Sequence, residues 1–186
     1  MRAGPNRPMQ LFHFSDDPAI SRFEPRPVRT PSPRPPGRDW LNGPLVWAID
    51  EAHQPMYLFP RDCPRILLWP LATTSAEDRA AWWGQSRARM LAYVEQGWLA
   101  ALGGARLHRY ELSAEPFECL DDAGMWVSRQ AVTPSAMVAV ADLPAALAAC
   151  DVELRVVDSL VPLRGVWRSS LHASGIRLRN AVGWEA

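Results

Sequence analysis

The sequence predicts a single α+β domain spanning residues 9–186, and two observations carry this prediction. The chain has 186 residues, of which 48% are hydrophobic, which suits one buried core of ordinary domain size. Short strand-like and helix-like segments are mixed without the regular strand–helix–strand order that a parallel sheet requires. Residues 1–8 are expected to form a loose tail outside this domain.

The first elements surround a histidine. A strand is expected at Gln10–Phe14, where aromatic residues are frequent. Ser15–Pro18 carries the chemistry of a helix start, so a single helical turn is expected at 19–23. The segment 25–38 is rich in proline and arginine, which predicts an extended loop. This loop is either a solvated connection, or a flap over a ligand cleft, or a contact for a polyanionic substrate.

The middle of the chain predicts two more strands, at Pro44–Ile49 and Arg65–Trp69, the second apolar enough to be buried on both faces. Asp50 is expected to cap a short helix at Glu51–Gln54. A further helix should begin at Ser75, whose hydroxyl can cap it while Asp78 reaches back as the acid of a capping box.

The longest helix is predicted at Gln85–Leu102, because apolar residues recur there at spacings of three and four before Gly103 and Gly104. Strands and helices are expected to alternate after it. The strands are Leu107–Leu112, Gly124–Ser128, Val138–Val140 and Val152–Val157, and the helices are Leu143–Cys150 and Leu160–Ala173, the latter capped by Ser159 and ended by Gly175.

Composition excludes several functions. All twenty basic residues are arginine, so no lysine nucleophile, Schiff base or phosphate-loop lysine exists here. The formal net charge of zero argues against binding of nucleic acid or anionic lipid through the overall charge of the protein. There is no secretory signal and no apolar run of roughly 20 residues, so we expect a cytoplasmic protein that does not enter a membrane. No metal site is expected, because the histidines and cysteines lack ligand spacing.

Two groups of residues have the chemistry of a nucleotide site. On a strand, His13 and Ser15 share one face, where they suit ribose hydroxyls or phosphate oxygens beside helix-start amides. Near Pro60, Arg61 and Arg65 can clamp a diphosphate. Tyr57 and Phe59 can stack on a base or a nicotinamide ring. The alternative is that an arginine pairs with the neighbouring Asp62 and the two rings fill the core.

These segments resemble DarT-type DNA ADP-ribosyltransferases. Leu11–Ser15 is similar to that family's opening strand, where a histidine contacts the NAD ribose, and Pro55–Leu67 to its aromatic-Pro-Arg segment. The resemblance implies an ADP-ribosyltransferase-like split β-sheet core that binds NAD, with His13 on the ribose and Arg61, rather than Arg65, on the diphosphate. The acceptor would be a nucleic acid or a protein.

The third similar segment, Val127–Val140, should carry the family's catalytic glutamate. Where the resemblance places this glutamate, the sequence has Gly124–Trp126, which contains no carboxylate. We assign Asp122 to that role instead. Carboxylates stabilise the positive charge that develops on the ribose or activate the acceptor. Catalysis by His13 and Asp122 is therefore one reading, and a nucleotide-binding or protein-interaction domain without catalysis is another.

One alternative chemistry and one further resemblance bear on function. RNA 2′-phosphotransferases share the transferase fold without its glutamate, and His13, Arg61 and Arg65, with Arg129 or His172, would supply that chemistry. The whole sequence also resembles a small bacterial family of unknown function. That family is marked by the His-Phe-Ser opening, the segments Asn42–Asp50 and Ser174–Ala181, and the Pro60–Arg65 core. The sequence does not indicate an oligomeric state.

Overall fold

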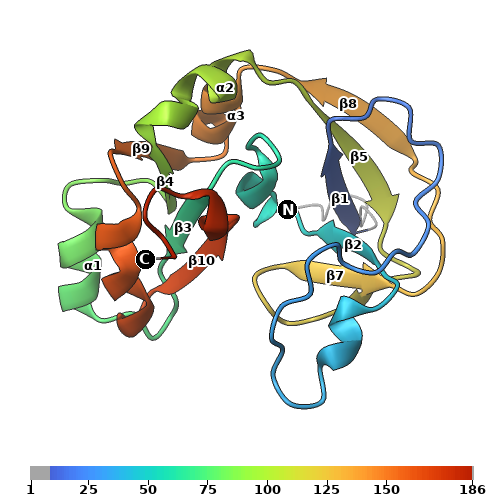
Figure 1. Cartoon of the computed structure of the whole chain (residues 1–186), viewed down its shortest axis with the longest axis horizontal. Coiled ribbons are helices and arrows are strands. Elements are labelled where there is room, and N and C mark those ends of the chain that lie inside the picture. Colours follow the sequence, from blue (N-terminus) through green and yellow to red (C-terminus); the bar gives the residue numbers. More distant parts are fainter. Residues whose placement is uncertain (1–8, 186) are drawn as a thin grey trace, which may run out of the picture. The chain divides into compact units, whose positions relative to one another are not determined.

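The computed structural model describes residues 9–185, so the predicted tail at residues 1–8 lies outside its range. It confirms the α+β class, with short helices and two β-sheets (Figure 1). Residue contacts divide the chain into two compact units, and the single domain and the transferase-like core stay predictions. Unit 1 comprises the residues up to Gln54 and Leu107–Ala139, and unit 2 comprises Pro55–Arg106 and Val140–Ala186.

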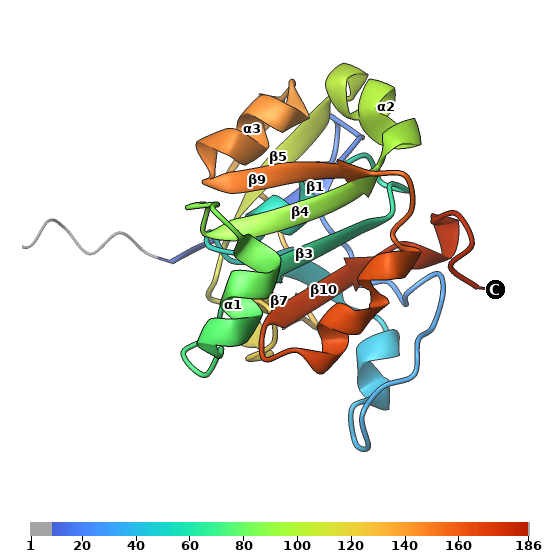
Figure 2. The same ribbon diagram turned by 90° about the vertical axis from the view of Figure 1, so that its left-hand side faces the viewer.

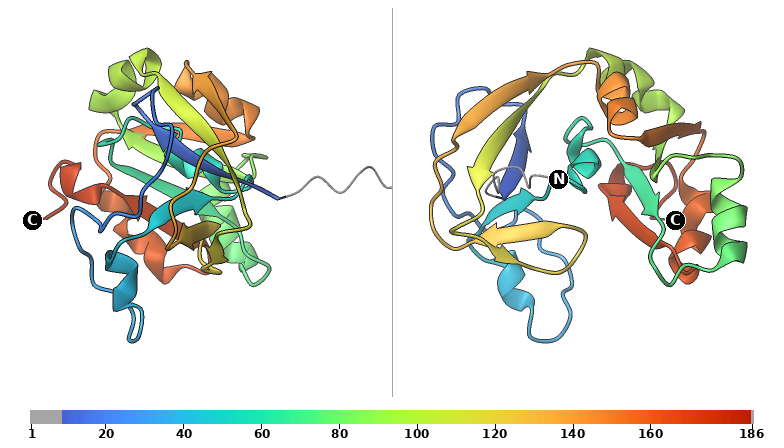
Figure 3. Two further views of the ribbon diagram at one scale, coloured as in Figure 1. Left: turned by 90° about the vertical axis from the view of Figure 1, so that its right-hand side faces the viewer. Right: turned by 180° about the vertical axis from the view of Figure 1, so that it is seen from behind.

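The strands of unit 1 belong to a six-stranded sheet with the order β6-β7-β2-β1-β5-β8. β1 pairs antiparallel with both β2 and β5, which sets His13 opposite Tyr110. β7 pairs with the edge of β2 that faces away from β1, as the right panel of Figure 3 shows. The strands are β1 (Gln10–Ser15), β2 (Val46–Ile49), β5 (Leu107–Ser113), β6 (Glu118–Cys119), β7 (Met125–Ser128) and β8 (Ala136–Val140).

The helical turn predicted at 19–23 is wrong. Phe23 instead forms an isolated β-bridge with Val132, with nitrogen-to-oxygen distances of 2.8 and 2.9 Å. The N–H of Ile20 donates to the Tyr110 hydroxyl. These partners satisfy the backbone without a helix. Phe23 and Val132 thereby join the hydrophobic core of unit 1. The segment 25–38 is a loop, as predicted, but it is not extended throughout, because it bends at 29–30 and turns at 36–37 before the 3-10 helix η1 (Asp39–Asn42).

Unit 2 is built on a four-stranded sheet with the order β10-β3-β4-β9 (Figure 2). β3 pairs antiparallel with β4 and β10, whereas β4 and β9 are parallel. The helix α1 and the 3-10 helix η4 lie on the face that Figure 2 presents. These elements are β3 (Arg65–Trp69), β4 (Met90–Glu95), β9 (Val152–Val157), β10 (His172–Ile176), α1 (Ala76–Trp83) and η4 (Val161–Arg168).

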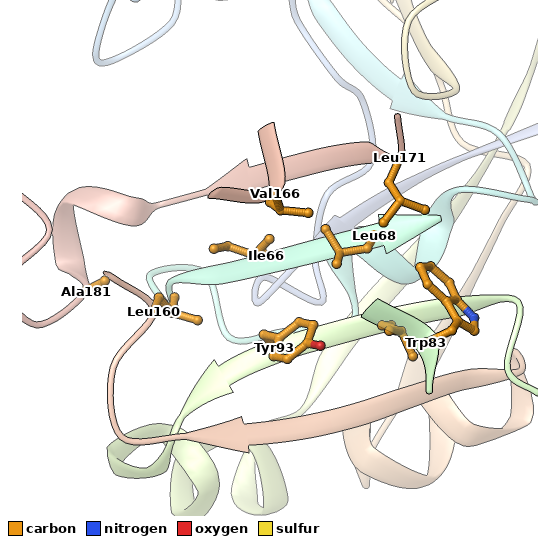
Figure 4. Packing of buried hydrophobic residues seen from close by; sticks show 9 residues of the cluster. Ile66, Leu68, Trp83, Tyr93, Leu160, Val166, Leu171 and Ala181 are labelled. Atoms are coloured by element: carbon orange, nitrogen blue, oxygen red, sulfur yellow. The ribbon is translucent and has the colours of Figure 1, made fainter. Parts of the chain in front are cut away.

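Side chains from that face form a hydrophobic core of unit 2 (Figure 4). Ile66 and Leu68 of β3 and Tyr93 of β4 pack with Trp83 of α1 and Val166 of η4. Burying one such side chain contributes roughly 1.5–3 kcal/mol, so this cluster fixes α1 and η4 against the sheet. The remaining helices are η2 (Gln54–Tyr57), η3 (Gln96–Trp98), α2 (Leu99–Gly104), α3 (Leu143–Ala149) and η5 (Leu178–Asn180).

Ser75 caps α1 as predicted, since its side chain accepts the N–H of Asp78. The predicted capping box is incomplete. The Asp78 carboxylate accepts hydrogen bonds from Ser170, at 2.7 Å from its N–H and 2.6 Å from its hydroxyl, and the N–H of Ser75 also donates to Ser170. Asp78 therefore ties α1 to the segment before β10.

Two predicted helices are wrong over most of their length. Gln85–Leu102 contains the strand β4, every residue of which is buried between β3 and β9, so the helix-like spacing arises from a fully buried strand. Only the end of this segment is helical, in η3 and in α2, and α2 includes the two glycines that were expected to end the helix. Leu160–Ala173 contains η4, which ends at Arg168, and the start of β10, which also includes Gly175. Within residues 9–185, no helix has the length and apolar character needed to cross a membrane.

Candidate functional site

His13 is held in one orientation and one tautomer. It lies half-buried on β1, with Nδ1 2.8 Å from the carbonyl oxygen of Trp47 on β2. A carbonyl only accepts, so Nδ1 carries the proton and Nε2 is the acceptor nitrogen of the neutral ring. The Phe23 ring packs against the imidazole with centroids 4.6 Å apart. His13 is therefore held in a defined orientation, with Nδ1 as the donor to Trp47.

The helix-start amides predicted beside His13 do not exist, because Ser15–Pro18 leads into a turn. Ser15 is 6% exposed, and its hydroxyl accepts the N–H of Asp17 at 3.1 Å. The N–H of Ala19 donates in turn to the Asp17 carboxylate at 2.8 Å. These amides are satisfied within the turn, so Ser15 acts in the structure as a turn-forming residue.

A carboxylate–imidazole pair lies where β2 ends. The Asp50 Oδ1 atom is 2.8 Å from both the Nδ1 atom and the backbone nitrogen of His53, and each side chain is between a quarter and a third exposed. Burial alone would raise the pKa of the Asp50 carboxyl, but the hydrogen bonds from His53 outweigh burial and lower it. Asp50 caps a helical turn, as predicted, since its Oδ1 atom accepts the N–H of His53 and its carbonyl accepts the N–H of Gln54 at 3.0 Å. Residues 51–53 form a turn that leads into η2 rather than the predicted helix.

A strained turn closes over this pair. Between β6 and β7, Asp121, Ala123 and Gly124 have φ values of 52°, 48° and 72°, in the left-handed region that costs roughly 1–2 kcal/mol for a residue with a Cβ. The Gly124 carbonyl accepts the N–H of Asp50 at 2.9 Å. A Cβ added at Gly124 would lie 2.4 Å from the Nδ1 atom of His53, so only glycine fits there.

Asp122, our assigned carboxylate, lies in the same turn. Its side chain is exposed, and its backbone carbonyl accepts the N–H of Met125 at 2.9 Å. The structure therefore brings the turn that carries Asp122 onto Asp50 and His53. Sequence reasoning missed this pair. The Asp-x-x-His spacing, which places both residues in one turn, is the signal that could have indicated it.

In unit 2, Arg65 is buried beneath the loop that carries Arg61. Its Nε and Nη1 atoms donate to the carbonyls of Met56 and Cys63, at 2.9 and 3.0 Å. The rings of Tyr57 and Phe59 lie 5.8 and 5.0 Å from its guanidinium carbon. Burial lowers the pKa of Arg65 to about 10. Phe59 is 2% exposed and lies in the core, as our alternative reading held, whereas Tyr57 is half-buried.

The loop is also held from the C-terminal side. The Arg61 carbonyl accepts from Arg177 Nε at 3.3 Å, and the Asp62 carbonyl accepts from Asn180 at 2.7 Å. Asp62 and Arg61 are exposed at its tip. Two segments that mark the resemblance to a family of unknown function therefore meet here, Pro60–Arg65 and Ser174–Ala181.

The assigned residues are divided between the units. His13, Ser15 and Asp122 belong to unit 1, and Tyr57, Phe59 and Arg61 belong to unit 2. Among residues 9–185, no group of three or more His, Cys, Asp or Glu side chains is arranged to hold a metal ion.

Comparisons with known proteins give a family and no activity. Neither the curated proteins nor the solved structures contain a match to this chain. A family model described as a family of unknown function (DUF6886) matches residues 12–181, which extend from β1 to the residue after η5. This match covers most of the sequence and agrees with the resemblance to a family of unknown function. The chain belongs to the DUF6886 family.

Proposed function

We propose that the chain binds NAD as an ADP-ribosyltransferase-like protein, with His13 in contact with a ribose hydroxyl. The observation that carries the proposal is the fixed tautomer of His13, set by the Trp47 carbonyl at 2.8 Å. A ribose hydroxyl is a donor, and Nε2 of this tautomer is an acceptor. The packing of Phe23 on the ring supports the same role, because it limits the rotation that binding would otherwise have to restrict.

The other assignments are independent parts of the proposal. Arg61 is assigned to the diphosphate, since its side chain is exposed whereas Arg65 is 2% exposed and donates to two carbonyls. Tyr57 suits stacking on nicotinamide better than Phe59, which is buried. Asp122 is assigned as a carboxylate near the reacting ribose, and Ser15 as a support of the His13 strand.

Calorimetric titration with NAD tests the binding. We expect His13→Ala to weaken NAD binding by roughly tenfold, the loss of about one hydrogen bond. His172→Ala is the matched control, because His172 stacks on Trp69 at 4.1 Å in the sheet of unit 2. Equal affinity of wild type and His13→Ala would contradict the assignment.

The same titration tests Arg61. Arg61→Ala should weaken NAD binding more than His13→Ala does. Arg87→Ala replaces an exposed arginine with no assigned role and should leave NAD affinity unchanged.

The two alternatives predict different results. A nucleotide-binding domain without catalysis would bind NAD and release no nicotinamide. An RNA 2′-phosphotransferase would need Arg65 at the ligand, together with His13, Arg61 and either Arg129 or His172. The hydrogen bonds of Arg65 to Met56 and Cys63 and the stacking of His172 on Trp69 favour structural roles for both. We therefore retain the NAD reading.

A further inference from the structure

We infer that Asp50 and His53 form an acid–base pair, in which His53 is the catalytic base that deprotonates the acceptor in ADP-ribosyl transfer. The inference rests on the proposed function and supplies the group that the sequence lacks where a glutamate was expected. The hydrogen bond of 2.8 Å from the imidazole to Asp50 carries it.

The pair has the arrangement of an oriented base. An ionised carboxylate only accepts, so Nδ1 of His53 donates to Asp50 and Nε2 is the basic nitrogen. Asp50 also accepts the backbone N–H of His53 at 2.8 Å, which fixes both ends of the histidine. The carboxylate then stabilises the imidazolium formed when Nε2 takes a proton, as in other carboxylate–histidine pairs. Asp50 is a positioning residue in this account.

The turn at Asp121–Gly124 gives the pair a fixed setting. Gly124 closes over it so tightly that a Cβ would lie 2.6 Å from the Asp50 carboxylate oxygen. Two residues with side chains hold left-handed conformations to bring Gly124 there. Both side chains of the pair nevertheless remain partly exposed, at 26% and 29%, so substrate has access to them.

The surroundings of the pair bear on the acceptor. Glu51, Asp121 and Asp122 are exposed next to the pair in sequence or in the covering turn. Arg38 and Arg109 donate to Leu120 and Gln54, the neighbours of Asp121 and His53, so the charge around the pair is mixed. We assign water as the acceptor, because it is the smallest hydroxyl that a partly exposed base can deprotonate.

Nε2 of His53 takes the proton of the acceptor hydroxyl while its oxygen forms a bond to C1′ of the nicotinamide riboside. The bond from C1′ to the nicotinamide nitrogen breaks, and its electron pair leaves with neutral nicotinamide. The proton passes from His53 to solvent. With water as acceptor, the products are ADP-ribose, nicotinamide and a proton.

Nicotinamide release and NAD binding, measured on the full chain, test the inference together. His53→Asn retains an amide donor toward Asp50 and removes the base, so release should fall roughly 100-fold or more while NAD affinity is unchanged. Asp50→Asn should lower kcat and leave KM unchanged. His172→Asn is the control, and His53→Gln is a second variant in case His53→Asn does not fold.

Each result decides between the claims. Release by wild type that persists in both His53 variants would overturn the inference and keep the proposed function. NAD binding by wild type without release would also overturn the inference and favour the domain without catalysis. Absence of NAD binding by wild type would overturn the proposed function, and the inference with it.

Discussion

Two loops, one in each unit, are positioned in opposite ways. The Pro60–Pro64 loop of unit 2 is held by polar side chains that bond its carbonyls, chiefly the buried Arg65 and the exposed Asn180. The Asp121–Gly124 turn of unit 1 is held by backbone geometry, with three left-handed residues and one carbonyl bonded to Asp50. The first loop depends on the side chains of Arg65, Arg177 and Asn180, and the second depends on the absence of a side chain at Gly124.

The polar groups at the two loops differ in exposure. Arg65 is 2% exposed and donates to carbonyl partners, so its charge serves the loop. Asp50 and His53 are hydrogen-bonded to each other and partly exposed, which is the basis of the role that we propose for them.

The largest expected effect is the loss of Arg65. In Arg65→Met the carbonyls of Met56 and Cys63 lose a buried donor, and we expect the free energy of unfolding to fall by about 3 kcal/mol. Urea unfolding followed by tryptophan fluorescence measures it. Arg61→Met, the exposed arginine of the same loop, should change it by less than about 0.5 kcal/mol. Equal effects would show that Arg65 does not hold the loop.

The next effect tests the turn. Gly124→Ala should destabilise the protein by about 2–4 kcal/mol, because it adds a clash with Asp50 and His53 to the conformational cost. Gly37→Ala is matched, since Gly37 has a φ of 79° but no atom within 4 Å of an added Cβ. It should cost only about 1 kcal/mol. The difference in thermal midpoint between the two variants measures the clash, and similar midpoints would contradict tight closure over the pair.

A third variant should increase the free energy of unfolding, by a smaller amount. Ala123 has a φ of 48°, so Ala123→Gly relieves a left-handed residue and should stabilise the protein by about 0.5–1 kcal/mol. The same urea experiment measures it. Destabilisation would mean that the Ala123 methyl group makes contacts that outweigh the strain.

The smallest expected effect concerns the stability of the protein at acidic pH. Because the folded-state pKa of Asp50 lies below its ordinary value of 3.8, its ionised form stabilises the protein fully above pH 3.8. That contribution is lost as the pH falls through the lowered pKa. Asp50→Asn should therefore lose less stability than wild type between pH 5 and pH 2, as measured by urea midpoints. A parallel decline would show that the hydrogen bonds from His53 do not favour the ionised carboxylate.

Most strands were predictable from sequence because their patterns are local. β9 was predicted with its exact bounds, and β1 and β2 to within two residues. β4 was missed because Met90, Val94 and Trp98 have helical spacing, and only its pairing with β3 and β9 reveals a strand. The Asp50–His53 pair depends on Gly124, brought next to it by the pairing of β2 with β7, and spacing alone carries no sign of that contact.

The most direct test of the central claim is NMR of the four histidine side chains during titration with NAD. The account predicts that the ring resonances of His13 and His53 shift together and saturably, while those of His108, which is 9% exposed, and His172, which stacks on Trp69, stay nearly constant. Shifts confined to His172, or no shift of His13 at millimolar NAD, would contradict it.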